Sequence, residues 1–87
     1  PFFDRTRTII ERVAGAQRTP DRVDASTRLV DGFWLDSVEM LEVVIACEVE
    51  FGIVFSEDGD LDVASLDTIG TLVEVIRARV ASTQAGV

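Results

Sequence analysis

The sequence contains no histidine and no lysine, and it has a single cysteine. Without histidine, the chain lacks the commonest general base and the commonest metal ligand of proteins. A lone Cys47 excludes an intrachain disulfide and is typical of a reducing compartment. Because Cys47 also falls among apolar positions, we expect a buried hydrophobe rather than a nucleophile. The sequence therefore predicts no catalytic residue and no enzyme.

Long apolar runs are also missing. No stretch approaches the about 18 residues that a membrane-spanning helix needs, and the first residues lack the apolar segment of a signal peptide. We therefore expect a cytoplasmic protein without a membrane span. Its 87 residues, 47% of them hydrophobic, suffice for one compact core but not for two. The prediction is a single monomeric domain over residues 1–87, ordered from about 3 to 81, with a flexible tail at 82–87.

Positive charge is scarce and unevenly placed. The net charge is −8, and no basic residue lies between Leu29 and Ile76, where twelve carboxylates occur. Such a surface repels nucleic-acid phosphates and anionic lipids, and it attracts basic protein surfaces. The alternative interpretation is that the negative charge serves solubility alone. We expect protein partners and no nucleic acid.

The first part of the chain predicts one helix and a long loop. Apolar residues of residues 3–17 share one face at helical spacing: Phe3, Ile10, Val13 and Ala14. Asp4 is the expected cap, and the turn residues at 18–21 are the expected stop. Residues 18–35 then form a loop held by apolar anchors: Val23, Leu29, Val30, Phe33, Trp34 and Leu35.

The second half predicts three more helices. One opens at Asp36 or Ser37 and runs to Phe51, where Gly52 ends it. A short helical piece follows near residues 61–65. The last helix begins after Asp67 or Thr68 and runs to about Val80, with Arg77 and Arg79 complementing the dipole at its end. The fold class is therefore all-α, a four-helix bundle of three longer helices and a short third one, with the long loop between helices one and two.

The helix at residues 36–51 carries two apolar faces at about 100° per residue. One face holds Met40, Val43, Val44, Cys47 and Phe51, and the other holds Val38, Leu41, Ile45 and Val49. We expect the first face to meet the core. The second would be an exposed ridge, bordered by Glu42 and Glu48, for docking partners with basic rims. The alternative is a central helix that is buried on both sides.

Ser37 lies at the start of this helix, and an ordinary capping role is the alternative to a modification site. Its context favours modification. Residues 36–53 resemble the acyl carrier protein family, whose motif is Asp-Ser-Leu, an acidic helix and the ending Glu-x-Glu-Phe-Gly. Residues 66–73 resemble the start of that family's last helix. The resemblance covers residues 6–80.

The resemblance implies a carrier that catalyses nothing itself. A phosphopantetheinyl transferase would move 4'-phosphopantetheine from coenzyme A onto Ser37, and the thiol of this arm would carry acyl groups as thioesters. The partners would be acyl-loading and acyl-processing enzymes of fatty-acid, polyketide or specialised lipid biosynthesis, with basic docking surfaces. The expected partner-binding residues combine the family's positions with the apolar ridge: Asp36, Val38, Glu39, Leu41, Glu42, Ile45 and Glu48.

Two positions depart from the family pattern. Trp34 stands where the family usually has glycine, and Val49 stands where many fatty-acid carriers have glutamate. We expect Trp34 to require a different loop backbone, and its ring to lie across the mouth of the bundle rather than in the core. Both departures favour a specialised carrier over one of housekeeping fatty-acid synthesis.

Two other interpretations fit the same residues. A peptidyl or aryl carrier of nonribosomal peptide synthesis is the nearest one, and an unmodified acidic interaction module is the second. Asp58, Asp60 and Asp62 alternate like the start of a calcium loop, but position six is Val63 and position twelve is Ile69. A calcium loop needs glycine and glutamate at those positions, so we expect no metal site.

Overall fold

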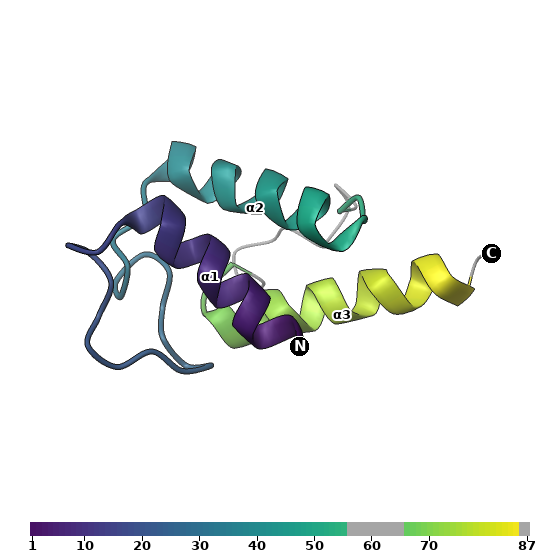
Figure 1. Ribbon diagram of the computed structural model, residues 1–87, viewed down its shortest axis with the longest axis horizontal. Coiled ribbons are helices and arrows are strands. Elements are labelled where there is room, and N and C mark those ends of the chain that lie inside the picture. The colour runs from purple at the N-terminus through teal and green to yellow at the C-terminus, as the bar shows by residue number, and fades with distance from the viewer. Residues whose placement is uncertain (56–65, 86–87) are drawn as a thin grey trace.

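The computed structural model describes residues 1–55 and 66–85, with side chains as far as residue 82. Three helices make up this part of the chain: α1 (Phe2–Ala14), α2 (Ser37–Phe51) and α3 (Ile69–Ala85). The described residues contain no strand, only an isolated antiparallel bridge between Arg28 and Thr68. The all-α class is confirmed (Figure 1). The predicted short helix near 61–65 lies outside the described residues, so the fourth helix of the bundle stays a prediction.

Helix α1 is shorter than the sequence predicted. Gly15 ends it with φ at 83°, in the region that glycine tolerates best, and the Gly15 amide donates to the Glu11 carbonyl at 2.8 Å. The stop therefore precedes the turn residues at 18–21. Asp4 does not cap the helix either, because Pro1 occupies the N-cap position and Asp4 lies in the first turn.

Helix α2 begins and ends where the sequence predicted. The Asp36 carboxylate accepts a hydrogen bond from the Glu39 amide at 2.8 Å, and the Glu39 carboxylate accepts one from the Asp36 amide at 3.1 Å. This reciprocal pair is a capping box, and it satisfies two amides that the helix itself leaves unbonded. At the other end, Gly52 adopts the left-handed conformation with φ at 64°.

Helix α3 starts at the predicted cap but runs further. The Thr68 hydroxyl accepts a hydrogen bond from the Thr71 amide at 3.1 Å. The helix passes Val80 and reaches Ala85, and its last part projects beyond the other two helices (Figure 1). Arg77 and Arg79 are therefore not in its last turn, and their predicted dipole role is wrong. The Arg77 guanidinium instead lies 5.1 Å from the centre of the Phe2 ring.

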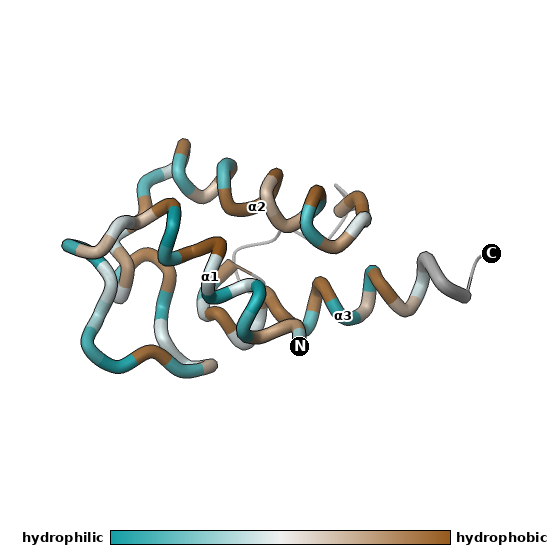
Figure 2. The backbone as a smooth tube through the Cα atoms, viewed as in Figure 1, coloured by the Kyte–Doolittle hydropathy of each residue, from teal (hydrophilic) through white to brown (hydrophobic). Residues whose placement is uncertain are grey.

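The core is assembled from all three helices and from the loop between α1 and α2. Hydrophobic segments recur along each of these elements (Figure 2). The largest fully buried apolar side chains are Phe33, Ile10, Leu29, Ile69, Leu72, Ile76 and Val43. Phe33 and Leu29 belong to the loop, so the loop is part of the core and not only a connection.

The loop is also paired with the start of α3 through its backbone. The Leu29 amide donates to the Asp67 carbonyl at 3.0 Å, and the Ile69 amide donates to the Thr27 carbonyl at 3.1 Å. A side chain at Gly32 would place its Cβ 2.4 Å from the Arg28 carbonyl oxygen, so this tight segment requires glycine. These contacts hold the chain that leads into α2.

Candidate functional site

Ser37 is the first residue of α2, and its side chain is exposed. Within the described residues, its hydroxyl makes no hydrogen bond. The positive end of the α2 dipole lies at this residue, which suits a phosphodiester attached to the hydroxyl. The site is thus accessible and electrostatically compatible with a phosphate, while nothing described beside Ser37 activates it as a nucleophile.

The residues on both sides of Ser37 belong to a connected network. Arg18, in the loop after α1, donates through Nη1 to the Glu39 carboxylate at 2.8 Å and through Nη2 to its other oxygen. The same Nη1 donates to the Trp34 carbonyl at 3.1 Å, and Nε donates to the Ala14 carbonyl at 2.9 Å. One guanidinium therefore joins the end of α1, the loop before Ser37 and the first turn of α2.

This network lowers the pKa of Glu39. Hydrogen bonds from the Arg18 guanidinium are the main cause, and with the Asp36 amide they lower the pKa of the Glu39 carboxyl to about 2. Sequence reasoning treated Arg18 only as part of the stop of the first helix. The pair is 21 residues apart in the chain, and no local periodicity links residues at that separation.

Trp34 adopts the backbone conformation that glycine prefers, with φ at 58°. A residue other than glycine is uncommon in this region, and the chain places a large side chain there. That tryptophan requires a loop backbone different from that of the family stays a prediction. The Trp34 side chain is 65% exposed. Its neighbours Phe33 and Leu35 are both buried, so they anchor the loop while the ring lies outside the core.

The two apolar faces of α2 separate as predicted. Val43, Val44 and Cys47 are buried, while Val38, Leu41, Ile45 and Val49 are exposed at 66%, 57%, 51% and 80%. These four exposed residues form the apolar ridge. Burial of α2 on both sides is excluded. An isolated apolar residue on a surface is ordinary, but four at helical spacing form a continuous patch.

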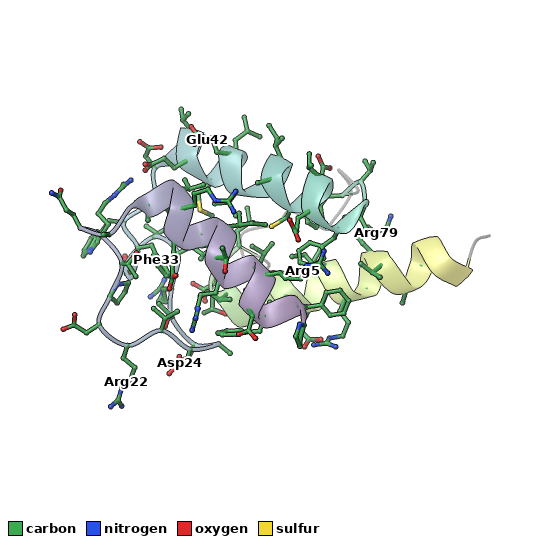
Figure 3. All side chains as sticks on the ribbon, viewed as in Figure 1. Arg5, Arg22, Asp24, Phe33, Glu42 and Arg79 are labelled. Atoms are coloured by element: carbon green, nitrogen blue, oxygen red, sulfur yellow. The ribbon has the colours of Figure 1, made fainter. Side chains whose placement is uncertain are left out.

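The acidic residues near the ridge differ in their surroundings. Glu42 is exposed and points away from α1 and α3 (Figure 3), and it has no hydrogen bond or ion pair among the described residues. The Glu48 carboxylate accepts a hydrogen bond from the Phe55 amide at 2.9 Å and is partly buried. Asp36 is exposed while it caps α2. Of the expected acidic docking residues, Glu42 alone has no partner within the described part of the chain.

Cys47 lies fully buried on the core face of α2. Burial raises the pKa of its thiol to about 12, and the neighbouring Glu50 and Glu48 add to this effect. A thiol with such a pKa stays protonated near neutrality and is a poor nucleophile. In residues 1–55 and 66–85, no three carboxylate or thiol side chains lie close enough to bind a metal ion.

Comparison with known proteins decides the family. No family model matches the chain. An acyl carrier protein, MbtL of Mycobacterium sp. (strain MCS), is 37% identical over 65 residues, which are 75% of this chain and 70% of that protein. The chain belongs to the acyl carrier protein family. It is therefore a carrier protein and not an enzyme.

Family membership agrees with the helical fold, and it implies a phosphopantetheine prosthetic group and acyl-processing partner enzymes. None of the helices in the described ranges has both the length and the apolarity to cross a membrane. One pocket of the described surface is lined by Thr8, Glu11, Arg12, Ala16 and Thr19, on α1 and the loop after it, and does not include Ser37.

Proposed function

We propose that Ser37 carries 4'-phosphopantetheine and that the thiol of this arm holds acyl intermediates as thioesters. The observation that carries the proposal is the exposed Ser37 at the N-terminus of α2, whose hydroxyl has no hydrogen-bond partner among the described residues, within the Asp-Ser motif of a chain from this family. The serine needs no activation by its own protein, since a phosphopantetheinyl transferase supplies the chemistry. The cytoplasm is the compartment we propose for these steps.

The apolar ridge and Glu42 are the proposed docking surface for that transferase and for acyl-loading and acyl-processing enzymes. Exposed Leu41 and Ile45 supply apolar contact area, and Glu42 supplies a negative charge that attracts a basic rim. The pathway we propose is fatty-acid, polyketide or specialised lipid biosynthesis. Trp34 and Val49, which depart from the housekeeping pattern, favour the specialised lipid or polyketide branch.

Attachment is tested by intact-mass measurement after incubation with coenzyme A and a promiscuous phosphopantetheinyl transferase. Wild-type protein should gain the mass of one arm, and Ser37→Ala should gain none while its helical circular dichroism stays unchanged. Ser26→Ala, a change at another exposed serine, is the matched control and should load like wild type. Arm mass on Ser37→Ala would refute the assignment, and an unloaded wild type would favour the acidic interaction module.

A further inference from the structure

Arg18 links three elements that meet beside Ser37. Its hydrogen bonds to the Ala14 carbonyl, the Trp34 carbonyl and Oε1 of the Glu39 carboxylate are between 2.8 and 3.1 Å long. A planar guanidinium can satisfy several acceptors at fixed angles, which a lysine ammonium cannot do. At 34% side-chain exposure Arg18 is more buried than the arginines of the other ion pairs between described residues, and Glu39 at 19% is more buried than their carboxylates. Solvent therefore screens this pair less than those others.

Both carboxylate oxygens of Glu39 accept hydrogen bonds in this arrangement. One oxygen accepts from Arg18 and from the Asp36 amide, and the other oxygen accepts from Arg18. The pair is neutral as a unit, so it adds little to the field that a basic partner meets. Glu42 lies on the same helix with its charge uncompensated by any described neighbour.

We propose that Arg18 is a positioning residue for Ser37, and that its ion pair removes Glu39 from the charge that the α2 surface offers to partners. The proposal rests on the proposed function for its second half. Through the Trp34 carbonyl and the Glu39 carboxylate, Arg18 holds the chain on both sides of Asp36 and Ser37. Glu39 acts within the chain, and Glu42 steers the partner.

The positioning half is tested on the unmodified protein, without any partner. Arg18→Gln should accelerate amide hydrogen exchange at Asp36 and Glu39 about tenfold, because the charge-assisted bonds that order this turn are lost. Arg18→Lys, which keeps the charge but not the planar fork, should restore only part of the protection. Glu74→Gln, an exposed change on α3, should leave exchange at these amides unchanged. Wild-type exchange rates at Asp36 and Glu39 in both Arg18 variants would overturn the proposal.

The charge half is tested by loading kinetics with coenzyme A and the transferase at several salt concentrations. Glu42→Gln should lower kcat/KM at low salt and flatten its salt dependence. Glu39→Gln should lower kcat about fivefold, since a loosened turn presents Ser37 less often in a reactive geometry. Combining Arg18→Gln with Glu39→Gln should add no further loss of kcat, because both changes break one network. The double variant should also keep the wild-type salt dependence, because the pair that it removes is neutral as a unit.

Two results would overturn this half: a salt dependence of the Arg18→Gln, Glu39→Gln double variant as flat as that of Glu42→Gln, or additive losses of kcat in the double variant. Failure of the proposed function looks different, since wild-type protein would then gain no arm mass at all. The hydrogen-exchange result would still decide the role of Arg18 in that case.

Discussion

Trp34 combines a left-handed backbone with a large exposed side chain. A residue other than glycine pays roughly 1 kcal/mol or more for such a conformation, and this cost is borne here without burying the ring. Arg18 helps to hold the conformation, because it donates to the Trp34 carbonyl. The indole ring lies three residues before Ser37, so it is within reach of an arm attached there.

Replacing Trp34 by glycine should change the free energy of unfolding by less than about 1 kcal/mol. Relief of the left-handed strain is offset by the larger entropy that glycine gains in the unfolded chain. Leu35→Ala, at the buried neighbour, should instead cost about 2–5 kcal/mol. Urea denaturation measures both. A loss for Trp34→Gly as large as that for Leu35→Ala would show that the ring stabilises the fold as core residues do.

Glu39 should make stability depend on pH in the acid range. Its pKa is lowered from 4.5 to about 2 in the folded chain, so the unfolded state binds the proton more readily. The contribution of the pair is therefore complete above the unfolded pKa and is lost as pH falls through the folded one. The free-energy difference between wild type and Glu39→Gln should stay constant from pH 7 to about 5 and shrink toward pH 2. A difference that stays constant down to pH 2 would contradict the ion pair.

Helix α2 has two apolar faces, of which one is buried and the other is exposed. Its core face is closed by Val43, Val44 and Cys47, and its other face carries the apolar ridge. The capping box fixes the start of the helix, and the left-handed Gly52 fixes its end. The same caps place Ser37 at the first turn, ahead of the ridge.

A substitution on the apolar ridge should affect binding, and one on the core face of α2 should affect stability. Leu41→Asp should change the free energy of unfolding by less than about 1 kcal/mol, since the side chain is largely exposed, and it should weaken transferase binding about tenfold. Val44→Ala should do the reverse, with a loss of about 1–3 kcal/mol in stability and unchanged affinity for the folded protein. Calorimetric binding and urea denaturation measure the two effects. Unchanged affinity of Leu41→Asp would remove the ridge from the docking surface.

The molecule as a whole depends on the loop between α1 and α2 as much as on its helices. Leu29 and Phe33 are fully buried, and the loop backbone pairs with the residues that start α3. Arg5, labelled in Figure 3, links α1 to the end of α2, since it donates to the Glu50 carboxylate at 2.9 Å and its guanidinium lies over the Phe51 ring. The loop and this ion pair thus add to the direct packing of the helices.

Removing the Phe33 ring should therefore destabilise the entire fold. Phe33→Ala should cost about 3–5 kcal/mol and lower the thermal midpoint in one cooperative transition. Val30→Ala, in the same loop but half exposed, should cost less than about 1 kcal/mol. Thermal unfolding followed by circular dichroism compares them. Equal small losses would mean that the loop is dispensable to the core.

The sequence by itself determined the helical class, both ends of α2, the division of its apolar faces and the serine at its first turn. These features depend on local periodicity and on capping residues within a few positions of one another, which the printed order of residues shows directly. Helix α1 ends before the turn residues that predicted its stop, because Gly15 ends it, and α3 runs further than predicted, because no strong stop follows Val80.

Only the tertiary structure shows which charged side chains have partners among the described residues and whether the Trp34 ring is exposed. Arg18 meets Glu39 across the loop, the Phe55 amide binds Glu48, and Trp34 keeps a glycine-like backbone with its ring exposed. Val30, expected to anchor the loop, turned out to be exposed as well. Such outcomes depend on distances between residues far apart in the chain, or on which side of a loop meets the core. No local pattern carries that information, because packing of the whole molecule sets it.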